Sequence, residues 1–323
     1  MSESIKVWPL KCKGHTFGSR SVGSFGRIVH SVRVFSRELA RPSGVYPRRK
    51  TLGLALGGGF ARGIAHVGVL QVLEDEGIAV NYVAGTSVGA IVGAAFCGGM
   101  TAGELADMAK TLRLADFARL TVSRYGFYNN DRMARLFERV LKHLTFEELR
   151  IPLAITATEF RSGEAVVFTK GPLVDPIRAS CAYPGMFLPV EIEGRSYIDG
   201  MLAYGVPTTP LRRMGAERVI GVHLSARWGH AGPPRHVFEV IGQCFTIAQS
   251  KLSGAWMRDA DLVIEPDVSG FAYDCFERTP ELIAAGEKAM RAALPQVRAM
   301  LGAWKSEKDG LTKVVGPQAS PAA

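Results

Sequence analysis

The chain of 323 residues is 47% hydrophobic and 21% charged, a composition that excludes a largely disordered protein. Its formal net charge of +9 lies entirely in residues 1–50, which hold 11 Lys or Arg and two acidic residues, whereas the remainder holds 28 residues of each sign. No run of 18 apolar residues predicts a transmembrane helix, and the five dispersed cysteines favour reduced thiols over a metal site or a disulfide framework.

Residues 1–50 are rich in Ser, Gly and Arg, and they lack an apolar segment followed by a small-residue cleavage site. Three interpretations stay open for this basic segment: a solvated flexible leader, an arm attracted to an anionic membrane, and an organelle transit peptide. We expect a leader at 1–50, one folded domain at 51–304 and a loose tail at 305–323. The expected location is cytoplasmic or peripheral to a membrane, with organelle targeting left open.

Strands and helices alternate from Thr51 onward. The apolar run Leu52–Leu56 ends in three glycines and predicts a buried strand, and residues 62–76 have helical periodicity with Gly77 as the C-cap. In chain order we then predict a strand at 78–84, helices at 88–96, 102–112 and 132–141, strands at 151–158 and 165–169, and a hairpin at 190–198. A strand at 219–224, a helix at 236–257, a strand at 262–265 and a helix at 280–301 complete the series. This order predicts an α/β fold in three layers, with a mainly parallel central sheet.

The segment 112–131 interleaves aromatic and basic residues: Phe117, Tyr125, Phe127 and Tyr128 among Arg113, Arg119 and Arg124. Two interpretations are open for it. It forms a flap beside the active site that meets a lipid surface, or its aromatic side chains pack in the core.

A first motif predicts a nucleophilic serine. Gly85, Ser87 and Gly89 form a G-x-S-x-G pattern directly after a predicted strand and directly before a predicted helix. Such a strand–turn–helix junction presents a serine hydroxyl at a helix N-terminus, where negative charge is favoured. The pattern alone is also met in ordinary serine turns, and it is the context that indicates catalysis.

A second motif is the glycine-rich loop that follows the first strand: Gly57, Gly58, Gly59, Phe60, Ala61, Arg62 and Gly63. Consecutive glycines let backbone N–H groups converge on a phosphate or on a tetrahedral oxyanion. Phe60 and Arg62 break the spacing of a dinucleotide-binding loop, and no G-K-[ST] follows, so we favour an oxyanion hole. Two interpretations of Arg62 are equally open. It packs on the surface at the start of the helix, or it acts on the oxyanion loop or on a substrate phosphate.

A third motif, Asp199 followed by Gly200, closes the predicted hairpin. By itself it is best interpreted as a common Asp-Gly turn. Four histidines compete with it as the base: His223, His230 and His236 follow it in the chain, and His66 lies on the predicted helix after the glycine loop. We expect His66 and His223 to be structural, whereas His230 and His236 lie in a polar loop around residues 232–234.

The three motifs together resemble the patatin-like phospholipase family, and in particular its bacterial members. The glycine-rich loop ends in Arg62 and Gly63, the serine turn runs from Gly85 to Gly89, and the third motif is Asp199, Gly200 and Met201. The stretch 177–185 is similar to the helix and turn that precede the family's Asp-Gly motif. Phe60 and Met201 depart from the usual small residues.

The resemblance implies a serine acyl-ester hydrolase with a Ser87–Asp199 dyad, no catalytic histidine and no metal or organic cofactor. Gly57, Gly58, Gly59 and Phe60 would form the oxyanion hole, supported by Arg62, Gly63, Gly85, Gly89 and Gly200. The expected partner is an acyl lipid, with phospholipid or lysophospholipid as the leading class. Residues 1–50 could contact an anionic membrane, no nucleic acid is expected, and the oligomeric state is open. A non-catalytic lipid-binding regulator and a Ser-Asp-His esterase remain as alternatives.

Overall fold

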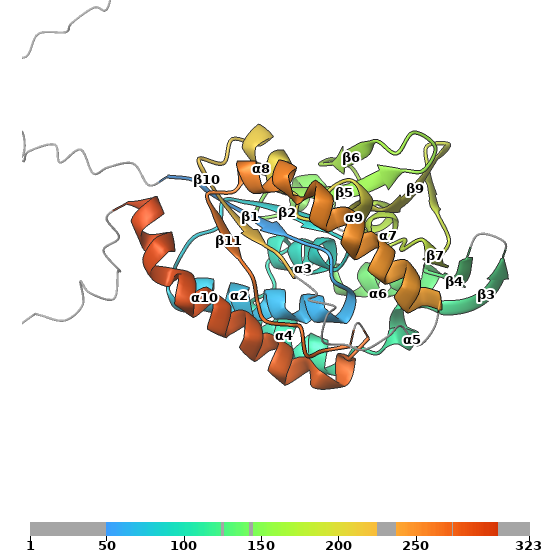
Figure 1. Cartoon of the computed structure of the whole chain (residues 1–323), viewed down its shortest axis with the longest axis horizontal. Helices are drawn as coiled ribbons and strands as arrows, with labels where there is room; N and C mark the ends of the chain where they lie inside the picture. Colours follow the sequence, from blue (N-terminus) through green and yellow to red (C-terminus); the bar gives the residue numbers. More distant parts are fainter. Residues whose placement is uncertain (1–49, 124–125, 142–144, 225–236, 273, 303–323) are drawn as a thin grey trace, which may run out of the picture. The chain divides into compact units, whose positions relative to one another are not determined.

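The computed structural model describes residues 50–123, 126–141, 145–224, 237–272 and 274–302 (Figure 1). The expected tail at 305–323 therefore lies outside the described residues. The expected leader at 1–50 does so as well, except for Lys50. Within the described ranges, no helix is both long and apolar enough to cross a membrane.

The central sheet is mainly parallel, as predicted. Its strands follow the order β11-β10-β1-β2-β5-β9-β8, with β6 paired to β5. The strands from β11 to β5 are parallel, whereas β9, β8 and β6 are antiparallel additions at one side. The bounds are β1 Leu52–Leu56, β2 Tyr82–Thr86, β5 Leu153–Glu159, β6 Ala165–Phe168, β8 Val190–Ile192, β9 Arg195–Asp199, β10 Arg218–Val222 and β11 Leu262–Ile264.

Helices cover both faces of this sheet (Figure 1). One layer holds α2 (Ala65–Asp75), α3 (Val88–Cys97), α4 (Ala102–Thr111) and α10 (Thr279–Leu301), and the other holds α8 (Thr208–Arg213) and α9 (Val237–Asp259). The remaining helices are α5 (Leu114–Phe117), α6 (Asp131–Val140) and α7 (Val174–Ser180). The three-layer α/β class expected from the alternation of elements is confirmed.

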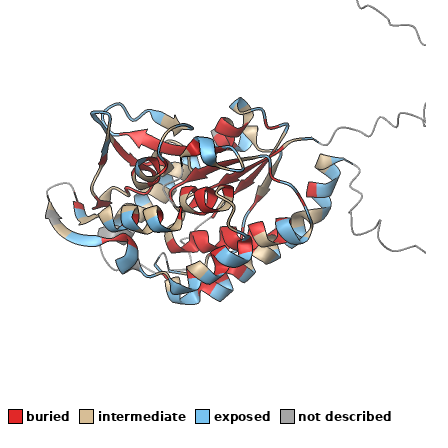
Figure 2. Ribbon diagram, turned by 180° about the vertical axis from the view of Figure 1, so that it is seen from behind, coloured by how far each residue is buried: buried red, intermediate tan, exposed pale blue. Residues whose placement is uncertain are grey.

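The side chains of β1 show how the layers differ. Leu52, Leu54 and Leu56 are fully buried against the layer of α2 and α3, and the residues between them are Gly53 and Ala55. A side chain at Gly53 would lie 2.8 Å from the Cβ of Ala216, so the α8 side approaches the sheet closely. Figure 2 shows the buried residues concentrated in the central strands and on the helix faces turned toward them.

Several parts of the fold differ from the expectation, and the short helices α5 and α8 were not predicted. The second strand begins at Tyr82 instead of residue 78, because Ile78 packs into the core from a loop and Asn81 hydrogen-bonds to both backbone groups of Leu52. A second sheet was not predicted: β3 (Arg119–Ser123), β4 (Gly126–Asn129) and β7 (Gly185–Phe187) lie in the order β3-β4-β7. Strands β3 and β4 belong to the segment 112–131, for which a flap or core packing was open.

Candidate active site

Ser87 is the single residue between β2 and α3, and the tight turn there imposes its backbone conformation. Its φ of 54° and ψ of −124° lie in a region that costs a non-glycine residue of order 1–3 kcal/mol. The flanking glycines make the turn possible. A Cβ at Gly85 would lie 2.4 Å from the Gly89 carbonyl oxygen, and one at Gly89 would lie 2.1 Å from the Leu56 carbonyl oxygen. The turn therefore requires glycine at both positions.

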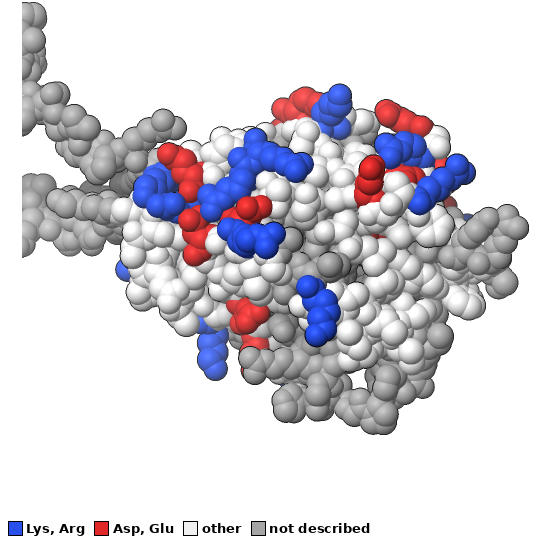
Figure 3. Space-filling view, turned by 45° about the horizontal axis from the view of Figure 1, so that its top comes forward, with Lys and Arg blue, Asp and Glu red and all other residues white. Residues whose placement is uncertain are grey.

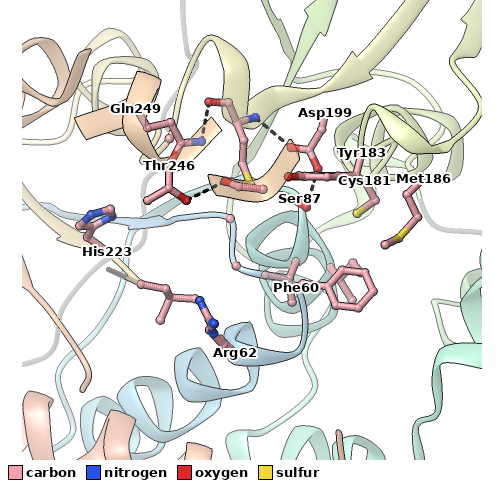
Figure 4. Close-up of a pocket in the computed structure, with 18 of the residues that line it drawn as sticks. Phe60, Arg62, Ser87, Cys181, Tyr183, Met186, Asp199, His223, Thr246 and Gln249 are labelled. Atoms are coloured by element: carbon pink, nitrogen blue, oxygen red, sulfur yellow. Dashed lines mark hydrogen bonds between the residues drawn. The ribbon is translucent and has the colours of Figure 1, made fainter. Parts of the chain in front are cut away.

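Asp199 lies directly opposite this hydroxyl. The Ser87 Oγ donates a hydrogen bond of 2.8 Å to Oδ2 of Asp199, and the backbone N–H of Met201 donates one of 2.9 Å to Oδ1 (Figure 4). Strands β2 and β9 lie on either side of β5. Thr86, the residue before Ser87, pairs with Thr156 of β5, and Asp199 pairs with the next residue, Ala157, so Ser87 and Asp199 meet across β5. The structure thus brings together two residues that are 112 positions apart in the sequence.

The carboxyl group of Asp199 is suited to exchange protons near neutrality. Asp199 is only 1% exposed, and its burial raises the pKa of the carboxyl from 3.8 to about 7, because an anion loses its hydration there. The hydrogen bonds from Met201 and Ser87 act in the opposite direction and are outweighed. A carboxyl with this pKa both accepts and returns a proton under ordinary conditions.

Two of the four residues predicted to form the oxyanion hole, Gly57 and Gly58, already use their N–H groups in hydrogen bonds to other parts of the chain. The Gly57 N–H donates to the carbonyl oxygen of Val222 at 3.1 Å, which continues the pairing of β1 with β10. The Gly58 N–H donates to the carbonyl oxygen of Gly205 at 3.3 Å. Both groups hold the loop in place and are therefore not available to a substrate oxygen in this arrangement.

Gly59 fits the predicted donor role better, and Phe60 lies next to it in the loop. Within the described part of the chain, no hydrogen bond engages the Gly59 N–H. A Cβ at Gly59 would lie 2.6 Å from Cδ1 of Leu224, so a side chain at this position would displace that of Leu224. Phe60 follows with a φ of 53°, at the start of the short 3-10 helix η1 (Phe60–Ile64). Both residues line the same cavity as Ser87 and Asp199.

Two further motif glycines allow close backbone packing around the site. A Cβ at Gly63 would lie 2.2 Å from a methyl group of Val88, so η1 and α3 approach each other closely. A Cβ at Gly200 would lie 2.3 Å from the Thr156 carbonyl oxygen, which places the turn after Asp199 directly on β5. The supporting roles expected for Gly63 and Gly200 thus have a steric basis.

Ser87 and Asp199 lie in the wall of a cavity of about 380 Å³. Most of its lining side chains are apolar and come from several elements: Phe60, Val88, Ile91, Phe117, Met133, Met186, Phe187, Met201, Leu224, Trp256, Met257 and Phe276. Figure 4 shows Phe60 and Met186 on one side of Ser87, and Arg62 and His223 on the other. The cavity offers an acyl chain an apolar environment next to a nucleophile.

A family model described as patatin-like phospholipase matches residues 54–212, the segment that contains all three motifs. These residues form a patatin-like phospholipase domain. An uncharacterized NTE family protein of Mycobacterium tuberculosis is 36% identical over 187 residues, which are 57% of this chain and 51% of that protein. The chain thus spans about half the length of this relative.

Two other comparisons cover more of the chain. Patatin-like phospholipase domain-containing protein 6 of Mus musculus is 29% identical over 231 residues, which are 68% of this chain and 17% of the mouse protein. The crystal structure of VipD from Legionella pneumophila aligns with a TM-score of 0.49 at 15% identity, over 77% of this chain and 67% of that chain.

Arg62 of the patatin-like domain is buried and is not a surface residue. Its Nε donates to the carbonyl oxygen of Phe271 at 3.0 Å, and burial lowers the pKa of the guanidinium. The side chain also lines the cavity. Arg62 therefore ties the loop before α2 to the segment before α10, which places a cationic group in the cavity wall.

The structure describes two of the four candidate histidines, His66 and His223. His66 is fully buried, its Nε2 lies 2.8 Å from the Gly57 carbonyl oxygen, and burial lowers the pKa of the imidazole to about 4. His223 lines the cavity and packs its ring 5.2 Å from that of Trp256, and burial lowers its pKa too. His230 and His236 lie outside the described residues.

Sequence reasoning missed several residues that shape this site. Ser180 at the end of α7 accepts the Ser87 N–H at 2.8 Å, and the buried thiol of Cys181 lies in the cavity wall with its pKa raised by burial. Thr246 and Gln249 line the cavity from α9, and Gln249 donates to the Met201 carbonyl oxygen at 3.0 Å (Figure 4). Helix α9 was predicted from periodicity, but only its packing shows which residues face the site.

Replacing Gly89 by alanine is expected to lower the free energy of unfolding by about 3 kcal/mol or more, because the added methyl group would overlap the backbone of Leu56. Thermal or urea unfolding measures the effect. Gly103→Ala is the matched control: this glycine lies in α4, a Cβ there would meet its nearest atom at 3.9 Å, and the change should stabilise the protein by about 0.5–1 kcal/mol. Equal melting of the two variants would show that the serine turn tolerates a side chain.

Proposed function

We propose that this protein is a serine acyl-ester hydrolase that acts on lipids, with Ser87 as nucleophile and Asp199 as general base. The observation that carries the proposal is the 2.8 Å hydrogen bond from the Ser87 hydroxyl to a buried carboxyl group with a pKa of about 7. Membership of the patatin-like phospholipase family supports the reaction class. The strained turn at Ser87 supports it as well, since such strain is concentrated at functional residues.

The proposed reaction passes through an acyl-enzyme. Ser87 Oγ attacks the carbonyl carbon of the ester while Asp199 takes the hydroxyl proton, and the carbonyl oxygen becomes an oxyanion. Backbone N–H groups of Gly59 and Phe60 would bind this oxygen, and one such donor typically contributes about 3 kcal/mol. The tetrahedral intermediate then expels the alcohol, which receives its proton from Asp199. Water repeats the sequence on the acyl-enzyme, with Asp199 again as base, and releases a fatty acid.

The cavity favours a long acyl chain as the group transferred. Its lining is mostly apolar, and α9 contributes the polar side chains of Thr246, Gln249 and Ser250 to the wall. An acyl chain gains free energy with each methylene group that leaves water, about 0.8 kcal/mol when burial is complete. The cation of Arg62 in the same wall favours a substrate with an anionic group, which makes a phospholipid or lysophospholipid the leading class.

The pKa of Asp199 predicts the pH dependence of hydrolysis. Because the base must be ionised, kcat/KM for a soluble short-chain ester should rise about tenfold per pH unit below about pH 7 and level off above it. Initial rates measured across this range, in buffers of constant ionic strength, test the proposal. A flat profile between about pH 5 and about pH 8 would contradict Asp199 as the base.

A Ser-Asp-His triad is the second candidate, because His223 lines the same cavity. The direct bond between Ser87 and Asp199 leaves no histidine between them, so His223→Gln should retain activity within about a factor of ten, whereas loss of a general base costs about 10²–10⁴-fold. Steady-state hydrolysis of the soluble ester provides the measurement, with His66→Asn as a buried comparison. If His223→Gln folds normally and loses activity as fully as a change of Asp199, the triad replaces the dyad.

A further inference from the structure

Helix α9 exposes apolar residues where a surface helix normally exposes polar ones. From residue 240 to residue 249, where the exposure of every residue is described, the exposed positions recur at intervals of three or four and are Val240, Cys244, Ile247 and Ala248. The other side of the helix packs on the domain: Phe245 contacts the ring of Tyr183, and Ile241 lies against Gly185. The exposed stripe is therefore fixed in orientation by packing on the opposite side.

The β3–β4 hairpin extends this apolar stripe. Gly126 of β4 pairs with Gly185 of β7, and Gly185 lies against α9, so the hairpin and the first turns of α9 are neighbours (Figure 1). The described part of the chain exposes six large hydrophobic residues, and five of them lie on these two elements: Leu120, Phe127, Val240, Ile247 and Met257. Leu120 pairs with Tyr128, the neighbour of Phe127, so Leu120 and Phe127 lie on opposite sides of the hairpin, and the hairpin exposes an apolar side chain on each side. We call the five residues together the apolar face. Their concentration on two adjoining elements indicates a contact surface.

The exposed charges on the same two elements are basic. Arg119 of β3 and Lys251 and Arg258 of α9 are exposed, and no Asp or Glu is exposed among the residues of α9, β3 and β4 whose exposure the structure describes. In Figure 3 the charged side chains gather at the left and the upper right and leave a broad uncharged area to the right of the centre. An apolar surface accompanied by cations is complementary to an anionic lipid bilayer.

The apolar face also adjoins the cavity. Met257 belongs to both, and α9 supplies Thr246 and Gln249 to the cavity wall. We propose that the apolar face docks on an anionic lipid bilayer, with Leu120, Phe127, Val240 and Ile247 entering the interface. Arg119, Lys251 and Arg258 then meet the headgroups. The inference rests on the proposed function for its biological sense, because docking would bring the cavity to the membrane that holds the substrate.

The test uses the full chain with Ser87→Ala, so that the vesicles are not hydrolysed. Phe127→Glu and Ile247→Glu each place a charge on the apolar face from a different element, at positions that are 50% and 52% exposed. Phe160→Glu is the matched control, since Phe160 is 51% exposed on the turn after β5, outside the apolar face. Co-sedimentation with vesicles of equal parts phosphatidylcholine and phosphatidylserine measures binding, and thermal melting checks the fold. Residues 1–50 are the same in all forms and cannot produce a difference between them.

Each of the two face variants should bind the vesicles at least about tenfold more weakly than the parent, because burying one large apolar side chain contributes at least a tenfold gain in affinity. The control should bind as the parent does. Equal binding by all four forms would overturn the proposal. The proposal would also fail if light scattering showed a changed oligomeric state of the face variants while their vesicle binding was unchanged. That result would assign the apolar face to a contact between proteins. Absence of soluble-ester hydrolysis by the chain with Ser87 intact would refute the proposed function, and the vesicle result would still decide the docking.

Discussion

Ser87→Ala should lower ester hydrolysis by at least about a thousandfold, because it removes the atom to which the acyl group would be transferred. The change deletes one hydroxyl and adds no volume, so the free energy of unfolding should move by no more than about 1 kcal/mol. The strained backbone at Ser87 is retained, since the flanking glycines and the hydrogen bond from the Ser87 N–H to Ser180 do not depend on the hydroxyl. Hydrolysis of a short p-nitrophenyl ester and thermal melting provide the two measurements.

Ser269→Ala is the matched control for this change. It removes a hydroxyl that donates to Asp267 on an exposed loop, outside the cavity, and should leave hydrolysis unchanged. A folded Ser87→Ala variant with the activity of the control would remove Ser87 from the mechanism and leave the strained turn without a catalytic explanation.

Asp199→Asn should lower hydrolysis by about 10²–10⁴-fold, because an amide nitrogen cannot accept the serine proton. The amide oxygen can keep the hydrogen bond from the Met201 N–H, so the geometry of the turn should survive. Pre-steady-state measurements should show that formation of the acyl-enzyme is slowed, since the base acts in the first step as well as in the second. An Asp199→Asn variant with full activity would show that another group accepts the proton.

The same substitution should stabilise the protein at alkaline pH. The folded-state pKa of about 7 exceeds the ordinary value of 3.8, so the native state loses stability as pH rises from about 4 to about 7 and Asp199 ionises in a buried site. Asparagine removes this cost. Near pH 8 the variant should therefore unfold at a higher temperature than the parent, and its free energy of unfolding should be larger by up to a few kcal/mol. Both differences should shrink near pH 4. A lower melting temperature of the variant near pH 8 would contradict the raised pKa.

The parts of the site that the sequence predicts are those in which local geometry dictates the residue type. Gly85 and Gly89 are required because a side chain at either would collide with backbone within the serine turn itself or with the adjoining strand. The alternation of strands and helices likewise predicts the three layers and the parallel sheet, because each pattern arises within one element. The pairing of Ser87 with Asp199 does not follow from local geometry, because Asp199 and Gly200 alone indicate a common turn; the resemblance to the patatin-like family implied it.

The parts that the sequence does not predict depend on contacts between distant segments. Nothing near Gly57 or Gly58 indicates that their N–H groups are taken by the carbonyl oxygens of Val222 and Gly205, which lie far along the chain. The strand Gly185–Phe187 is too short to carry a periodic pattern, so the second sheet was missed. The apolar stripe of α9 is also invisible in the sequence, because the periodicity of a helix does not show which side meets the sheet.

Covalent labelling tests the central claim most directly. A fluorophosphonate reacts with an activated serine hydroxyl and leaves a stable adduct that peptide mass spectrometry locates. The account predicts a single adduct on Ser87, strongly slowed labelling in Asp199→Asn and no labelling in Ser87→Ala. Labelling of a different serine, or equal labelling with and without Ser87, would contradict the account.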